Sequence, residues 1–361
     1  MRRPTQSAIG SGLRGAAPLI GALLVGAAVL AVSGRDPLTT YRLYWTQAFG
    51  SWHQIANTFA AATPILLTGV GAAIAFRAGV FNVGIEGSVY CGALAAVWAG
   101  VEWTALPGPL LALCALLFGM AVGALWLLLP ALLRAWLEID EVVTTLMLNY
   151  VAISLTTFLV LQYFLASTIG NAQTPAIAAK ALLPALTSGT SLTIGAVVAL
   201  IVVLGYGWFL RRTRLGTEIR MVGDNPSFAA GMGFSIRRAV IMTMLVGGAL
   251  GGLAGGLVMF GVTGNFTAGF STAPGYGYTG IAVAVLGRNS WLGLLLAAVF
   301  FGALASAGGV VQLFGDVPIA LTQVLQGTMM IFAGIQLVRT RRSRRRARKA
   351  PMAPVRKGVT A

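Results

Sequence analysis

Residues 109–129 read PLLALCALLFGMAVGALWLLL, a continuous apolar run without one charged side chain. About 20 such residues, wound as an α-helix, cross the hydrocarbon core of a bilayer. The same pattern predicts about ten transmembrane segments, near 16–32, 59–76, 84–101, 109–129, 142–165, 191–210, 239–261, 276–287, 291–311 and 317–338. The expected fold is therefore all-α, a polytopic membrane helix bundle.

The composition of the whole chain agrees with this interpretation. Hydrophobic residues make up 57% of the 361 residues and charged residues only 9%, whereas a soluble domain carries about 25% charged residues. Cys91 and Cys114 both lie in apolar runs and are interpreted as small buried hydrophobes. With a single histidine, His53, a zinc site is not expected, and we expect neither a metal nor a cofactor.

The basic residues predict the orientation. If the N-terminus is cytoplasmic, only three of the 25 lysines and arginines, namely Arg35, Arg42 and Lys180, face the outside, as the positive-inside rule requires. We expect residues 1–15 to form a cytoplasmic segment, 16–338 the transmembrane domain and 339–361 a basic cytoplasmic tail. The first span is interpreted as uncleaved, with a signal peptide as the alternative.

A cytoplasmic tail also requires an even number of crossings. The segment 276–287 is short and contains several glycines, so it could be a broken or re-entrant helix. Parity indicates that it crosses or pairs with its neighbour.

The arginine-rich segment 211–238 is the one large cytoplasmic loop that this topology predicts. Within it lie Gly223, Asp224, Asn225 and Pro226, a turn signal in which the acidic or amide side chain can cap a helix that begins after the proline. We expect a short helix over 227–232, lying on the membrane surface. The alternative is an ordinary polar connector.

The chain lacks the motifs of common enzymes. The dipeptide Gly-Lys does not occur, so no phosphate-binding loop of the Walker type is present, and we expect no enzymatic activity. Ionisable residues fall at span ends rather than inside the spans, which argues against a proton-driven transporter and favours a neutral solute.

Polar but uncharged side chains remain as candidates for a solute path, namely Asn82, Asn149, Asn265 and Tyr278. The alternative for each of them is hydrogen bonding between helices. For Arg77 and Glu86 we expect structural or capping roles, with Glu86 either capping the helix over 84–101 or interacting with Arg77.

Glycines recur at four-residue spacing in the span 239–261. They form a smooth face, which another helix backbone can approach closely, and they are Gly247, Gly248, Gly251, Gly252, Gly255 and Gly256.

Several ordered motifs resemble the permeases of ABC importers for branched-chain amino acids, simple sugars and nucleosides. They are AFRAGVFNVGIEG at 75–87, EVVTTLMLNY at 141–150, the loop from RLG at 214 through GDNP at 223 to GMG at 231, and GYGYTGIAVAVLGR at 275–288. The last stretch, with 36–38 and 49–51, resembles the nucleoside and simple-sugar branch. One departure is that the basic residue expected after Ala230 is absent.

This resemblance implies a transport subunit of the bacterial plasma (inner) membrane, with 16–338 as the permease domain. It implies a cytoplasmic ABC ATPase that binds the ATP, a second permease, commonly in a heterodimer, and an extracytoplasmic solute-binding protein. The cargo would be a nucleoside or simple sugar. The alternatives are a branched-chain amino acid or, in a different class, a secondary transporter.

Overall fold

The computed structural model describes residues 21, 23–166, 172–272, 275–315, 323–324, 326–328 and 331. Within these residues the regular secondary structure is helical, with two isolated β-bridges and no strand. The expected cytoplasmic segment 1–15 and basic tail 339–361 lie outside the described residues. So do most of the expected last span and the beginning of the first.

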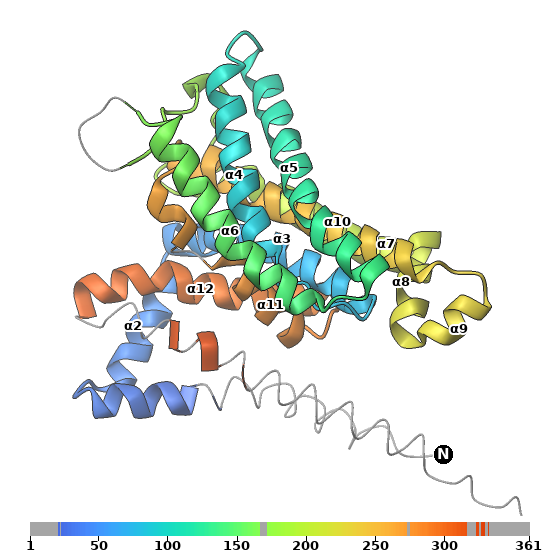
Figure 1. Cartoon of the computed structure of the whole chain (residues 1–361). Coiled ribbons are helices and arrows are strands. Elements are labelled where there is room, and N and C mark those ends of the chain that lie inside the picture. The colour runs from blue at the N-terminus through green and yellow to red at the C-terminus, as the bar shows by residue number, and fades with distance from the viewer. Residues whose placement is uncertain are drawn as a thin grey trace, which may run out of the picture.

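The helices follow one another along the chain, most of them with short connections, and a long connection at 163–194 joins α6 to α7 (Figure 1). They are α2 (Pro37–Phe49), α3 (Trp52–Arg77), α4 (Ile85–Glu102), α5 (Gly108–Leu137), α6 (Glu141–Gln162), α7 (Gly195–Arg212), α8 (Arg214–Asp224), α9 (Pro226–Gly231), α10 (Ile236–Val258), α11 (Tyr276–Leu286) and α12 (Trp291–Gly315). A π-helical turn, Met259–Thr263, extends α10, and short 3-10 turns occupy Ala179–Ala181 and Ala268–Thr272.

Six of the described helices are long and apolar enough to cross a membrane. They are Trp52–Arg77, Gly108–Leu137, Glu141–Gln162, Gly195–Arg212, Ile236–Thr263 and Trp291–Gln312. Each coincides with an expected span, and α4 covers the expected span 84–101. The chain is thus a multi-pass membrane protein, while the count of ten spans stays a prediction.

The short span expected at 276–287 is helix α11, which has only 11 residues. At 1.5 Å per residue it is about 16 Å long, roughly half of the hydrocarbon thickness. The 3-10 turn Ala268–Thr272 precedes it in the chain. α11 is therefore a half-length helix, as the glycine pattern of this segment suggested.

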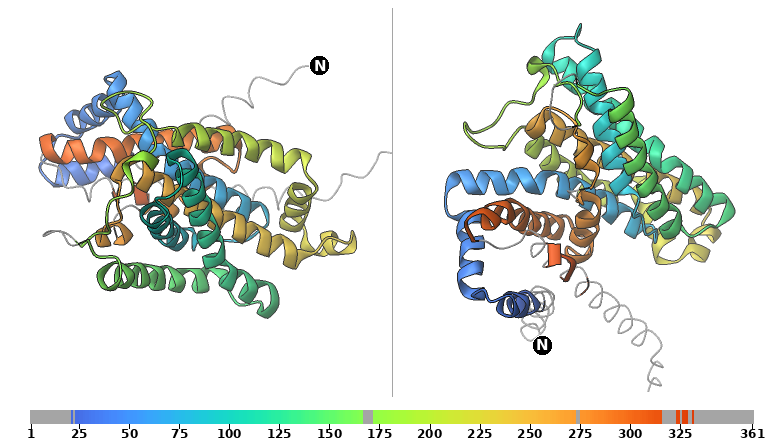
Figure 2. Two further views of the ribbon diagram at one scale, coloured as in Figure 1. Left: turned by 90° about the horizontal axis from the view of Figure 1, so that it is seen from above. Right: turned by 60° about the vertical axis from the view of Figure 1, so that its left-hand side comes forward.

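Helix α2 is an element that the spans did not predict. Asp36 is its N-cap and accepts hydrogen bonds from the backbone N–H groups of Leu38 (3.2 Å) and Thr39 (3.0 Å), while Pro37 starts the helix. Acceptance of the Thr39 hydroxyl and of these N–H groups lowers the pKa of Asp36. The chain turns at Gly50 and Ser51 into α3, which runs away from α2 (Figure 2).

The centre of the bundle is α10, which packs mainly against α5, α4 and α3 (Figure 1). Its glycines face two helices. A Cβ at Gly252 would collide with the backbone of Gly119 in α5, and one at Gly255 would collide with the carbonyl of Val89 in α4. The close backbone approach expected from the glycine spacing is confirmed, and it explains how three helices pack without large side chains between them.

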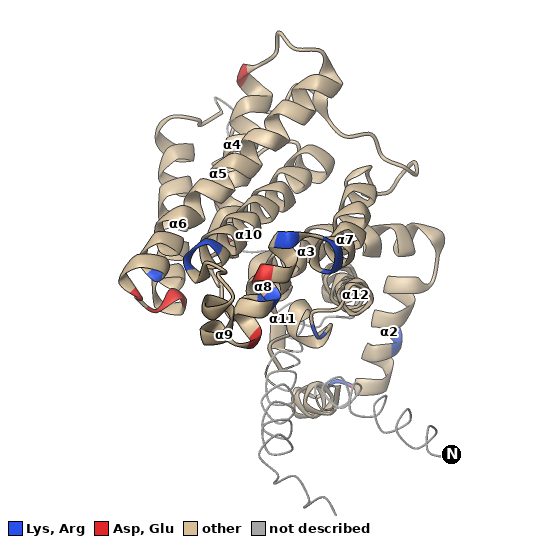
Figure 3. Ribbon diagram, turned by 90° about the vertical axis from the view of Figure 1, so that its right-hand side faces the viewer, with Lys and Arg blue, Asp and Glu red and all other residues tan. Residues whose placement is uncertain are grey.

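Most charged side chains of the described residues gather at one end of the bundle, around α8, α9 and the turn between α5 and α6 (Figure 3). The outward faces of α5 and α7 are, by contrast, lined with exposed leucine, valine and isoleucine. Apolar sides and a charged end are the pattern of a protein embedded in lipid.

Candidate translocation site and coupling loop

The carboxylate of Glu86 lies at the centre of a polar network inside the bundle. Glu86 is in the first turn of α4 and is 1% exposed. It accepts hydrogen bonds from the hydroxyl of Tyr90, from the backbone N–H of Gly277, and from that of Tyr278 at 3.3 Å. The first N–H groups of a helix lack partners within the helix. Glu86 therefore caps the beginning of α11.

The side-chain amide of Asn149 joins a third helix to the same place. Its Oδ1 accepts from the backbone N–H of Gly87 at 2.9 Å, and its Nδ2 donates to the carbonyl of Val83 at 3.1 Å and to the hydroxyl of Tyr278 at 3.3 Å. Asn149 is 1% exposed. With its polar atoms engaged by the protein, Asn149 pins α6 to the beginnings of α4 and α11.

Two of the four candidate path residues, Asn149 and Tyr278, are in contact here, whereas Asn82 and Asn265 have other surroundings. Asn82 is fully buried, and its Oδ1 accepts from the N–H of Gly84 at 3.0 Å. Its Nδ2 points toward Gly247 and has no hydrogen-bond partner within the described residues. Asn265 lies in the connection after α10, where its carbonyl accepts from the hydroxyl of Thr263.

The structure gives Arg77 and Glu86 separate partners. Arg77, at the end of α3, donates from Nη2 to the carbonyl of Asn289 at 2.9 Å, and the hydroxyl of Tyr206 donates to the same carbonyl at 2.8 Å. Arg77 thus fastens the turn between α11 and α12 to α3. The cap of Glu86 is on α11, not on its own helix α4.

The segment 211–238 contains the expected short helix, α9, between α8 and α10. Asn225 is its N-cap and accepts from the N–H of Phe228 at 3.1 Å, whereas Asp224 ends α8. Phe228 is 54% exposed and Met232, just beyond the helix, 59% exposed. The sequence prediction named the turn and missed these two apolar residues, although their position after an Asn-Pro cap was a readable signal.

Tight backbone packing connects this loop to the membrane helices. A Cβ on Gly223, in α8, would collide with the carbonyl group of Arg77, and Gly223 also lies close to Gly79. The segment after Gly79 leads directly to Asn82 and the beginning of α4. About eight residues of continuous chain therefore separate the contact with α8 from Glu86.

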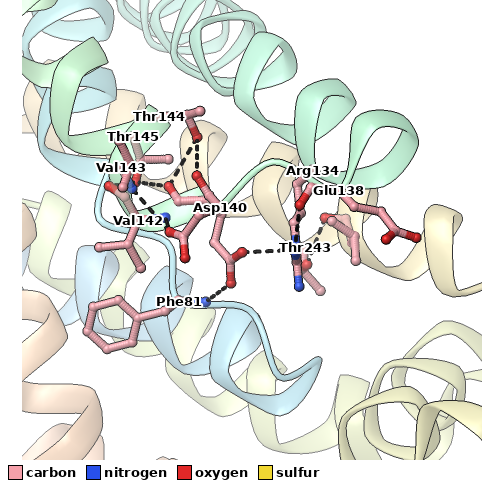
Figure 4. Close-up of polar contacts among 11 residues, drawn as sticks. Phe81, Arg134, Glu138, Asp140, Val142, Val143, Thr144, Thr145 and Thr243 are labelled. Carbon is pink, nitrogen blue, oxygen red and sulfur yellow. Dashed lines mark hydrogen bonds and ion pairs between the residues drawn. The ribbon is translucent and has the colours of Figure 1, made fainter.

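A second set of contacts ties the segment between α3 and α4 to α5 and α6 (Figure 4). Arg134, near the end of α5, forms an ion pair with Glu141 at 2.9 Å, and Glu141 also accepts from the backbone N–H of Phe81 at 3.2 Å. Asp140 caps α6 through the N–H groups of Val142 and Val143. The segment between α3 and α4 is thereby fixed to the α5–α6 turn.

The chain is thus a helical membrane bundle with a buried polar network around the carboxylate of Glu86 and a helix-bearing loop at its charged end. Residues 54–334 match the family described as "Branched-chain amino acid transport system / permease component", and the chain belongs to this family. It is an ABC transporter permease.

Three relatives illustrate the similarity. The nucleoside ABC transporter permease protein NupB of Lactococcus lactis is 32% identical over 87% of this chain and 88% of its own length. The glucose ABC transporter permease protein TsgB13 of Haloferax volcanii is 33% identical over 87% of this chain and 84% of its own. NupC, a nucleoside permease of the same Lactococcus strain, is 27% identical over 75% of this chain and 87% of its own. No solved structure matches the chain.

Proposed function

We propose that this permease imports a nucleoside across a bacterial plasma membrane as one subunit of an ATP-driven complex. A cytoplasmic ABC ATPase binds the ATP and docks on α9. A second, related permease completes the membrane part, and an extracytoplasmic binding protein delivers the solute. The chain itself then needs no cofactor, and its part is to open and close the path.

The observation that carries the proposal is the exposed apolar tip of the coupling loop. Phe228 in α9 and Met232 just beyond it are exposed, and α9 lies at the charged end of the bundle. Large apolar side chains that are exposed in this way mark protein contacts. The contact of Gly223 with the end of α3 provides a route for force from such a contact to the membrane helices.

Two sets of variants test the docking. The double substitution of Phe228→Ala and Met232→Ala should release the ATPase from the permease, measured by co-purification from membranes, and should abolish uptake. When residues 223–226 are replaced with a Gly/Ser linker, some of the ATPase subunit should still co-purify with the permease, but uptake should be lost. Unchanged uptake in both cases would remove the loop from the mechanism. Val262→Ala is a matched control, because Val262 is 57% exposed but lies in the π-helical turn at the end of α10, away from the loop.

The nucleoside cargo is supported by the resemblance to the two Lactococcus permeases. A simple sugar is the second candidate, favoured by the similarity to the Haloferax glucose permease. Uptake of a labelled nucleoside, competed by unlabelled adenosine, glucose, ribose and leucine, separates the classes. Competition by adenosine alone supports a nucleoside as the cargo. Depletion of ATP should stop uptake, whereas uptake by a secondary transporter would continue.

The second permease is proposed as a different chain. NupB and NupC come from one organism, and both are similar to this protein, which supports a heterodimer of related chains. Co-expression of this chain with a candidate second permease from the same genome, with different affinity tags, tests the pairing. Retention of one tag by the other is expected, and formation of same-chain dimers alone would contradict it.

A further inference from the structure

The turn between α11 and α12 has an unfavourable backbone conformation. Arg288 and Asn289 follow one another with φ angles of 52° and 51°, a left-handed region that is unfavourable for residues with a Cβ. Arg288 comes directly after the C-cap Gly287, at the position that glycine usually occupies. Among the described residues other than glycine, only Glu138 also has a positive φ. Two such residues in succession require the surrounding structure to hold them.

Two donors from other helices hold this turn. The carbonyl of Asn289 accepts a hydrogen bond from Nη2 of Arg77 at 2.9 Å and another from the hydroxyl of Tyr206 at 2.8 Å. Arg77 ends α3 and Tyr206 lies in α7, and the guanidinium and the hydroxyl also interact with each other. A carbonyl oxygen has two lone pairs, so both are occupied. These three residues are called the Asn289 clamp below.

The Asn289 clamp also contains a donor and an acceptor that do not meet. Nε of Arg77 and Oδ1 of Asn289 are both buried, and neither has a hydrogen-bond partner within the part of the chain that the structure describes. A buried polar atom without a partner is unfavourable. The clamp thus combines an unfavourable backbone with two unsatisfied atoms on adjoining side chains. These are features of an element that has a second arrangement.

The Asn289 clamp lies where the coupling loop meets the membrane helices. Only Thr213 separates α7, which carries Tyr206, from α8, which carries Gly223. Gly223 lies against the backbone carbonyl of Arg77, and the hydroxyl of Tyr206 bonds to the carbonyl of Asn289. The continuous segment formed by α7 and α8 therefore touches both of the residues that the clamp joins.

Helix α11 connects the Asn289 clamp to the polar network around Glu86. The first N–H groups of α11 are held by the Glu86 carboxylate, and its other end leads through Gly287 into the turn. Between these ends it packs on α3, where the hydroxyl of Thr68 donates to the carbonyl of Tyr276 at 2.8 Å. The half-length helix thus has the clamp at one end and the network at the other.

We propose that Arg77 and Tyr206 are positioning residues for transport. They hold the left-handed turn while α8 rests against α3, and a movement of α8 releases the turn, so that α11 shifts at the Glu86 network. This proposal rests on the proposed function, in which an ATPase moves the loop, and it names the joint through which that movement reaches α11. Transport then requires a turn that can be both held and released, so a change that favours either state slows uptake.

Glycine at position 288 tests the role of the backbone conformation. Arg288→Gly removes the Cβ that makes a positive φ unfavourable, and it therefore favours the held turn. We expect the thermal unfolding temperature of the purified complex to rise by about 2 °C and uptake to fall about threefold. Glu138→Gly is the matched control, because Glu138 is also exposed and has a φ of 56° but lies at the end of α5. It should give a similar thermal gain with unchanged uptake.

The outcomes of this experiment decide the proposal. Unchanged uptake by Arg288→Gly would mean that the strained turn has no part in transport, and would overturn the proposal. A fall in uptake without a rise in thermal stability would overturn it as well. Arg288→Gln removes the charge and keeps the Cβ, so an equal fall in uptake by this variant would assign the effect to the charge and refute the role of the backbone.

Removal of one donor tests the Asn289 clamp from the opposite direction. Tyr206→Phe should favour the released turn and lower uptake about threefold while ATP hydrolysis by the complex continues. Tyr41→Phe is the matched control, because the hydroxyl of Tyr41 in α2 also donates to a backbone carbonyl, that of Leu23 at 2.7 Å. Its ratio of uptake to ATP hydrolysis should not change. A parallel loss of uptake and hydrolysis in Tyr206→Phe would indicate a merely structural residue and contradict the proposal.

The two substitutions should compensate when they are combined. Arg288→Gly favours the held turn and Tyr206→Phe the released turn, so the double variant should take up solute faster than either single variant. A double variant that is as slow as the slower single variant, or slower still, would overturn the proposal.

Cysteine labelling follows the turn without reference to the cargo. Cys91 and Cys114 are replaced by alanine, and Asn289→Cys, which keeps the backbone carbonyl, is treated with a hydrophilic thiol reagent in membrane vesicles that contain the whole transporter. The rate of labelling should differ at least threefold between the nucleotide-free and the vanadate-trapped complex, and Arg288→Gly should reduce this difference. Equal rates in both states would overturn the proposal. If the unaltered transporter takes up no nucleoside, the cargo assignment fails, whereas this ATP-dependent contrast still tests the turn.

Discussion

Gly223 of α8 lies against the backbone carbonyl of Arg77 at the end of α3, with no room for a side chain between them. This contact places the coupling loop directly on the chain segment that leads to Asn82 and Glu86. Most of the charged side chains of the loop are exposed.

The contact predicts a specific coupling defect. Gly223→Ala should displace α8 from α3, because its Cβ would lie within 2.8 Å of the Arg77 carbonyl carbon. Uptake should fall at least about tenfold, a loss of roughly 1.4 kcal/mol in coupling, while ATP hydrolysis by the assembled complex continues. Gly205→Ala is the control, since nothing lies within 4 Å of a Cβ there. Wild-type uptake by Gly223→Ala would refute the idea.

The cap on α11 predicts a graded response at Glu86. Glu86→Ala removes the acceptor of two backbone N–H groups and of the Tyr90 hydroxyl, and unsatisfied buried donors cost about 1–3 kcal/mol each. Glu86→Gln keeps a carbonyl oxygen for the N–H groups. We expect thermal unfolding of the purified complex to shift several degrees downward for the alanine variant and much less for the glutamine variant. Equal shifts would contradict a capping role.

Asn149 should behave as a support for the path rather than as part of it. Asn149→Leu leaves the N–H of Gly87 and the carbonyl of Val83 without partners and frees the hydroxyl of Tyr278. The maximal uptake rate should fall, and the factor of this fall should be several times larger than the factor by which the KM rises. The free energy of unfolding should decrease by about 2 kcal/mol or more. A selective rise in KM with an unchanged maximal rate would instead assign solute contact to Asn149.

The glycine packing predicts a failure of assembly. Gly252→Val forces a branched side chain into the backbone of Gly119 and should destabilise the bundle by about 2 kcal/mol or more. The amount of folded permease in membranes, measured by size-exclusion chromatography after detergent extraction, should drop sharply. Gly309→Val in α12 is the comparison, because nothing lies within 4 Å of a Cβ at that position. Equal yields of the two variants would show that the contact between α10 and α5 tolerates side chains.

Local patterns in the sequence predicted much of this architecture. Apolar runs marked the long helices, the Asn-Pro turn marked α9, and the glycines of 276–287 marked a short helix. Helix α2 escaped prediction because its mixed composition resembles a loop, although Asp36 before a proline is a cap signal. The cap of Glu86 could not be predicted, because its partner Gly277 is 191 positions away and only the packed register of α4 against α11 brings the two together.

The interlocked backbones of α4, α5 and α10 also restrict how the molecule can change shape. Where glycine meets glycine, even a slide of a fraction of a turn drives a neighbouring side chain into a peptide group, so these three helices cannot shear past one another. They form a stator. Any alternation of access must therefore come from helices that move relative to these three.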